Sequence, residues 1–146
     1  MIKMSVKSNL KFPSMDFTEA LKYVAERIVV PEISGHIQTG TDIQGNKYGP
    51  LAASTIRMKG HANPLIGKER RLFSSSTYHQ TSRKKNEVLI RIKAIRADIG
   101  RFLQIEGVKS KRYGTRKFNF FGVNQIMETK AVNFMKRKIA EKIANG

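Results

Sequence analysis

The stretch that decides the fold is Glu87–Ile95, which reads EVLIRIKAI. Every second residue from Val88 to Ala94 is apolar, whereas Arg91 and Lys93 fall between them. Side chains of a strand point alternately to opposite faces, so this period of two predicts a half-buried strand with a basic outer face. A buried strand face needs a covering layer, and the patterns on either side of the strand indicate helices.

Downstream, residues 124–146 carry the strongest helical pattern of the chain. Asn124 is a favourable N-cap, and Asn145-Gly146 is typical of a helix stop. The apolar residues of this segment recur at helical spacing and form one stripe: Met127, Ala131, Met135, Ile139 and Ile143, widened by Ile126 and Phe134. Basic residues line the remainder, so the pattern predicts an amphipathic helix.

Upstream, residues 16–30 also predict an amphipathic helix. Asp16 and Glu19 have the spacing of a capping box at its start. Pro31 interrupts the apolar pattern, because proline lacks an N–H group and clashes with the preceding turn. The pattern resumes at Ile33 and ends near Gly40, which predicts either a kinked helix or two short helices.

The remaining segments are rich in Gly, Ser, Thr and basic residues. Leu51–Met58 predicts a short helix, and Phe118–Val123 predicts an aromatic strand. Residues 99–105 fit a helical turn or a strand equally well. Residues 43–86 and 107–117 predict long, flexible, basic loops. The elements together predict a single α+β domain over residues 1–146, with a small antiparallel sheet packed by N- and C-terminal helices.

Composition bounds the function. The 146 residues include 28 Lys+Arg, 11 Asp+Glu and no Cys, which gives a formal net charge of +17 and excludes disulfides and thiolate metal sites. No apolar run is long enough to predict a membrane span, and the first residues lack the apolar core of a signal peptide. A protein with this excess of positive charge attracts polyanions or acidic proteins. The candidate polyanion contacts are Arg83, Lys84, Lys85, Lys109, Lys111, Arg112, Arg116 and Lys117.

No pattern of catalytic residues stands out, which predicts a protein that is not an enzyme and needs no cofactor or metal. His36, His61 and His79 lack neighbours at metal-ligand spacing, and no Gly-rich phosphate loop occurs. Two other function classes stay open. One is a sequence-independent nucleic-acid-binding protein. The other is a small basic RNase, whose candidate site residues are His79, Arg112, Tyr113 and Arg116.

The aromatic run near Arg116 admits two interpretations. Phe118, Phe120 and Phe121 stack on nucleic-acid bases in the first, and lie in the core or in a subunit interface in the second. The second is the commoner use of such a strand. We therefore select four aromatic or apolar residues as candidate subunit or partner contacts: Tyr48, Leu72, Phe73 and Phe121.

The order of short motifs between Gly45 and Asn124 resembles the phage virion morphogenesis (tail completion) proteins. The motifs follow one another as GNKYGPL at 45–51, Ser54-Thr55, PLI at 64–66 with Leu72 and Ser75, QIEG at 104–107, and RKFNFFG at 116–122. This chain departs from the pattern of the family in three places. It has Tyr48 where the family more often has Trp, Leu103 where the family has His, and the charged run Gly67-Lys68-Glu69-Arg70 after the PLI motif.

The resemblance implies an α+β fold and a structural, non-enzymatic role. It implies a ring-forming component of the virion neck or tail end, made in the host cytoplasm. Its partners would be other copies of itself, head-completion or connector proteins, and tail-tube or terminator proteins, with DNA contact as a further candidate and no membrane association. Long loops that reach a neighbouring copy and become ordered on assembly suit such a ring.

Overall fold

The computed structural model describes residues 2–5, 15–49, 51–65, 77–92, 101, 104–105, 108–110 and 114–145. The chain forms two compact units. The first comprises Met1–Glu32, Tyr78–Arg91 and Val123–Gly146; the second comprises Ile33–Thr77 and Ile92–Gly122. The predicted α+β class with a small antiparallel sheet and helices at both ends is confirmed. A single domain over residues 1–146 stays a prediction.

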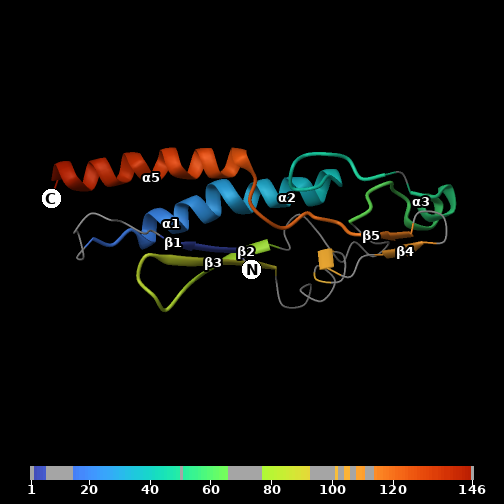
Figure 1. Ribbon diagram of the computed structural model, residues 1–146, viewed down its shortest axis with the longest axis horizontal. Helices are drawn as coiled ribbons and strands as arrows, with labels where there is room; N and C mark the ends of the chain where they lie inside the picture. The colour runs from blue at the N-terminus through green and yellow to red at the C-terminus, as the bar shows by residue number, and fades with distance from the viewer. Residues whose placement is uncertain are drawn as a thin grey trace. The chain divides into compact units, whose positions relative to one another are not determined.

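The first unit contains a three-stranded sheet in the order β1-β3-β2, made of β1 (Ile2–Ser5), β2 (Thr77–Thr81) and β3 (Glu87–Ile92) (Figure 1). β1 pairs antiparallel with β3, so that Ile2 lies opposite Ile90. Val88 and Ile90 are fully buried whereas Arg91 is exposed, which confirms the predicted period of two. Residues 93–95 of the predicted strand lie outside the described residues.

The N-terminal helical segment runs without a break through Pro31. It consists of α1 (Thr18–Val24), the π-helical turn η1 (Ala25–Val29) and α2 (Val30–Thr39). Of the two predicted alternatives, two separate short helices is wrong. A proline ring clashes with the carbonyl four residues earlier, and the wider π-helical turn directly before Pro31 relieves that clash. The helix continues past Pro31 because the π-helical turn makes room for the proline ring.

The predicted capping box at the start of this helix is wrong. α1 begins one residue later than expected, and its N-cap is Phe17, which offers no side-chain acceptor. The Thr18 N–H donates to Asp16 Oδ1 at 2.9 Å, while Glu19 pairs with Lys22 at 2.7 Å. The hydrogen bonds from Thr18 hold the pKa of Asp16 below its usual range. Asp16 therefore caps from outside the helix, without Glu19.

The C-terminal helix α5 (Gln125–Asn145) begins as predicted, because the Met127 N–H donates to the Asn124 side chain at 2.9 Å. It packs on α1, where the rings of Tyr23 and Phe134 stack at a centroid distance of 4.5 Å. The buried residues of α5 are Met127 and Phe134. The predicted amphipathic helix is present, but the C-terminal end of its apolar stripe is not covered, because Ile143 is 49% exposed.

The second unit contains the end of α2, the short helix α3 (Ala53–Lys59) and the antiparallel pair β4 (Val108–Ser110) and β5 (Gly114–Arg116). α3 confirms the predicted short helix. The two strands replace part of the predicted loop 107–117. They were missed because neither exceeds three residues and both are polar. Arg101 and the pair Gln104–Ile105 are helical, which favours the helical alternative over the strand.

The predicted aromatic strand Phe118–Val123 is wrong as a strand. Its backbone is irregular: the Phe120 N–H donates to the carbonyl of Phe118 at 3.0 Å, and the Asn119 carbonyl accepts from the Ile43 N–H at 2.7 Å. These two isolated hydrogen bonds take the place of the regular ladder of hydrogen bonds that a strand would form. Phe118 and Phe120 are nevertheless buried, so they belong to the core as the commoner interpretation expects.

Candidate functional site

The separated motifs of residues 45–122 meet in the second unit, and the ring of Tyr48 is one meeting point. It packs edge-on against Phe118 at a centroid distance of 4.9 Å. Its hydroxyl is buried and has no hydrogen-bond partner within the described residues. Burial raises the pKa of Tyr48 far above its usual range, and the Asp42 carboxylate adds to the rise. The ring of Tyr48, which was predicted as a partner contact, thus packs inside its own unit.

Gly49 and Arg116 form the second meeting point. The Arg116 guanidinium donates to the Gly49 carbonyl at 3.5 Å. A Cβ atom at Gly49 would lie only 2.9 Å from a guanidinium nitrogen, so a larger residue at position 49 would require the flexible Arg116 side chain to shift. Arg116 is partly buried, and this contact gives the predicted polyanion contact a structural role across 67 residues of sequence.

Gln104 and Phe121 form the third. The Gln104 side-chain amide donates to the Phe121 carbonyl at 2.8 Å, and its oxygen accepts from the Phe121 N–H at 3.0 Å. A side chain here satisfies both backbone groups that a neighbouring strand would otherwise satisfy. Phe121, which was predicted as a partner contact, remains partly exposed.

Asn63 is a central residue of the second unit that sequence reasoning missed. Its side-chain amide donates to the carbonyls of Ile37 and Gln38 at 2.8 and 2.9 Å, and its oxygen accepts from the Leu65 N–H at 2.9 Å. It therefore caps the C-terminal end of α2, next to Gly40 in the left-handed conformation. The Asn63-Pro64 pair, a common turn signal, was the available clue.

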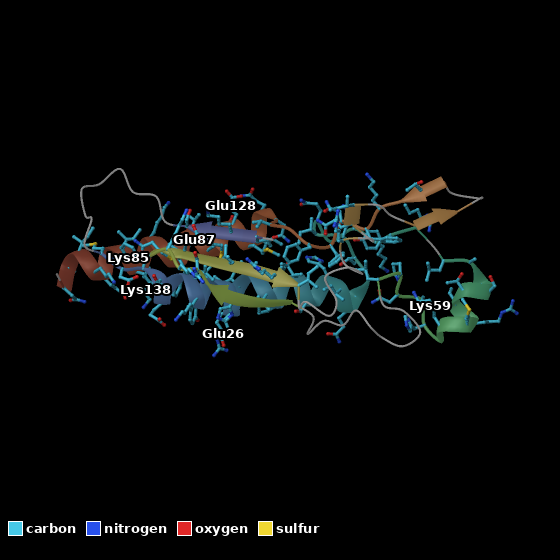
Figure 2. The ribbon with its side chains drawn as sticks, turned by 90° about the horizontal axis from the view of Figure 1, so that it is seen from below. Glu26, Lys59, Lys85, Glu87, Glu128 and Lys138 are labelled. Atoms are coloured by element: carbon cyan, nitrogen blue, oxygen red, sulfur yellow. The ribbon has the colours of Figure 1, made fainter. Side chains whose placement is uncertain are left out.

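A lysine supports this cap from α3. Lys59 (Figure 2) donates from Nζ to the Asn63 carbonyl at 2.7 Å. Burial lowers the pKa of Lys59. The motif containing Pro64 and the fully buried Leu65 is thus held to α2 and to α3 at once.

The predicted polyanion contacts fall in both units. Arg83, Lys84 and Lys85 are exposed in the turn between β2 and β3 of the first unit. Figure 2 labels Lys85. In the second unit, Lys109 lies in β4 opposite Thr115 of β5, and Lys117 is exposed directly after β5. Four predicted contact residues lie outside the described residues: Leu72, Phe73, Lys111 and Arg112.

A groove of about 800 Å³ lies between α1 and the C-terminal half of α5. Its floor is aromatic, with Phe17, Tyr23 and Phe134. Its rim carries both signs of charge, because Lys138 pairs with Glu141 at 3.1 Å and Lys142 lies over the Phe17 ring at 5.0 Å. A rim of mixed sign does not select an anionic or a cationic ligand.

The three histidines show no common arrangement. His36 Nδ1 lies 2.8 Å from the Thr41 hydroxyl, and His61 Nδ1 accepts from the Asn63 N–H at 3.2 Å. His79 lies in β2. Among the described residues, no group of three or more His, Asp or Glu side chains could hold a metal ion. Within the same residues no helix has the length and apolarity to cross a membrane. Of the RNase candidates, Arg112 and Tyr113 lie outside the described part of the chain.

Comparison of the chain with protein-family models, with curated proteins and with solved structures found no match.

Proposed function

We propose that this chain is a structural phage virion morphogenesis protein that completes the tail or joins it to the head. In this function it works as a ring-forming component of the neck or tail end. It binds further copies of itself and adjacent connector or tail proteins through its surfaces, and it makes and breaks no covalent bond. It assembles in the host cytoplasm and ends in the virion.

One observation supports this proposal above the others. The motif residues that carry the resemblance are far apart in the sequence, yet they contact one another in the second unit: Tyr48 with Phe118, Gly49 with Arg116, and Gln104 with Phe121. These contacts are ring packing and hydrogen bonds from side chains to the backbone. Residues that meet in this way specify an architecture, which is what a family of assembly proteins needs its motifs to do.

Deleting the reading frame from a phage genome that carries it tests the proposal. We expect lysates with normal amounts of DNA-filled heads and of tails that remain unjoined or incomplete when viewed by electron microscopy. Supplying the wild-type chain from a plasmid should restore infectious particles. Complete, infectious particles from the deletion phage would overturn the proposal.

The charge favours a second candidate, a sequence-independent nucleic-acid-binding protein. The exposed Arg83, Lys84 and Lys85 form a compact cationic turn on a chain of net charge +17. If this turn binds DNA, the affinity for arbitrary duplexes should fall steeply as the salt concentration rises. Changing all three residues to Gln should make the slope of log affinity against log salt concentration shallower, by an amount that corresponds to about three phosphate contacts. Changing Lys130, Lys136 and Arg137 to Gln removes the same charge elsewhere and serves as the control.

A further inference from the structure

A second apolar stripe on α5 is left largely uncovered. It consists of Val132, Met135, Ile139 and Ile143, whose spacing of three and four residues places them on one face of the helix. Val132 is 44% exposed and Ile143 is 49% exposed, while Met135 and Ile139 are partly buried. Solvent therefore reaches an apolar strip about three helical turns long.

This stripe is distinct from the face that holds α5 in the first unit. The buried face carries Met127 and Phe134, and Phe134 stacks on Tyr23 of α1. Successive helical residues are about 100° apart, so Met135 and the rest of the stripe lie to one side of that face. The packing of α5 within its unit does not use the stripe fully, which leaves it available to another molecule.

Charges border the stripe in an uneven way. Lys136 lies between Val132 and Ile139 on one side, whereas Lys142 on the other side directs its ammonium to the Asp16 carbonyl and the Phe17 ring. Glu128, which extends outward from the first turns of α5, marks the N-terminal end (Figure 2). Over the whole helix there are five basic and two acidic residues. Beyond Glu128, the stripe is thus bordered by Lys136 on a helix with an excess of basic residues.

We propose that this stripe binds an amphipathic helix of a different protein whose apolar face is bordered by Asp and Glu. Opposite charges beside a shared apolar seam fix partner and register. A second copy of this chain is a poorer occupant of the stripe itself, because it would present the same stripe beside the same excess of basic residues, whereas a ring can form through other faces. The inference rests on the proposed function in that it names the chemistry of a neighbouring virion protein.

Synthetic 21-residue peptides test the proposal. The probe is a helical peptide with Leu at three- and four-residue spacing and Glu at the bordering positions. One comparison peptide carries Lys in place of every Glu, and another has the Glu composition in scrambled order. We expect the full chain to bind the first peptide at least about tenfold more tightly than either of the others, as measured by fluorescence anisotropy.

Matched variants of the full chain locate the site. The double variant Val132→Ser with Ile143→Ser should weaken peptide binding about tenfold, whereas Ile126→Ser, at an equally exposed position on the opposite side of α5, should not. Lys136→Glu should weaken it, whereas Lys130→Glu, the same charge change off the stripe, should have a much smaller effect. Circular dichroism and thermal unfolding check that each variant is folded, and all the changed positions are exposed.

Other results would overturn the inference. Equal binding of the scrambled peptide would assign the attraction to net charge alone. Concentration-dependent dimers that the double Ser variant abolishes would assign the stripe to a second copy. Tighter binding to phosphatidylglycerol vesicles, lost in the same variant, would assign it to a membrane surface. A deletion phage with unjoined tails together with no peptide binding would leave the proposed function standing and remove this inference alone.

Discussion

At the scale of single residues, two asparagines hold distant segments in place. Asn86 has φ of 59°, the left-handed conformation, at the end of the turn between β2 and β3. Its side chain accepts from the Phe17 N–H at 2.5 Å and donates to the Met15 carbonyl at 3.2 Å, while its own N–H donates to the Thr18 hydroxyl at 3.1 Å. The side chain therefore satisfies a backbone donor at the start of α1 that no residue of α1 satisfies.

Replacing Asn86 tests this contact. Asn86→Ala should lower the free energy of unfolding by roughly 3 kcal/mol. The variant loses the side-chain hydrogen bonds of Asn86, and alanine is strained in the left-handed region because its side chain cannot form the local hydrogen bond that asparagine forms there. Asn86→Gly keeps the conformation without strain and should cost about 1 kcal/mol less. Urea unfolding at neutral pH measures both values. Equal costs for the two variants would contradict the role of the backbone conformation.

Asn63 allows an isosteric test. Asn63→Asp keeps the oxygen that accepts from the Leu65 N–H but removes the donor that serves the Ile37 and Gln38 carbonyls. It also places a negative charge at the negative end of the α2 dipole. We expect a loss of about 2 kcal/mol in unfolding free energy. Asn133→Asp, on the exposed side of α5, is the control and should stay within about 0.5 kcal/mol of wild type.

At the scale of elements, the β1–β3 pair contains a pH-sensitive link. The Glu87 carboxylate on β3 accepts from the Ser82 hydroxyl at 2.6 Å and pairs with Lys3 of β1 at 3.2 Å. The Ser82 hydrogen bond, followed by the contact with Lys3, lowers the pKa of Glu87, and partial burial opposes these effects. Folding therefore favours the ionised form of Glu87, which loses its proton more readily in the folded chain than in the unfolded chain.

The sign of the pH dependence follows. A carboxylate with a lowered pKa contributes stability that is present above the pKa of the unfolded chain and is lost as pH falls through the folded pKa. Wild type should thus lose stability between about pH 5 and pH 3 more steeply than Glu87→Gln, in urea titrations at each pH. Ser82→Ala should show an intermediate slope. A Glu87→Gln variant with the wild-type pH profile would contradict the assignment.

The sequence predicts elements whose signal is local. The alternation of Glu87–Ile92, the N-cap Asn124 and the helical spacing of α5 each lie within one element, and the structure confirms them. β1 was missed, because four residues of alternating polarity carry too little periodicity. The π-helical turn before Pro31 was also missed, because it answers a steric clash that a hydrophobic pattern does not encode.

The candidate site was predictable only in part, because its contacts join residues that are distant in sequence. The motif residues of 45–122 were recognised in order, but no pattern indicated that Arg116 would lie over Gly49 or that Gln104 would bond to the backbone of Phe121. Arg116 was expected to face a polyanion, but its guanidinium also donates to the carbonyl of Gly49, 67 residues away in the sequence. Sequence reasoning named the residues, while tertiary packing decided what they do.

At the scale of the whole molecule, the charge imbalance dominates. With 28 basic and 11 acidic residues, we expect repulsion between like charges to outweigh the surface ion pairs, each of which contributes little in water. Raising NaCl from 50 to 500 mM should therefore raise the thermal midpoint by several degrees, because screening weakens repulsion between like charges. Differential scanning calorimetry measures the shift. A midpoint that falls with NaCl would mean that attractive pairs outweigh the repulsion.

The contact between Asn86 and the start of α1 also has a consequence for the order of events during synthesis. The helix leaves the ribosome first, but the group that fixes its first turn is translated 69 residues after Phe17. A nascent chain halted before codon 86 keeps the cap from Asp16 but lacks the acceptor for the Phe17 N–H, so we expect the beginning of its helix to fray more than in the finished chain. Proteases that cleave near Met15 would distinguish arrested chains from finished ones.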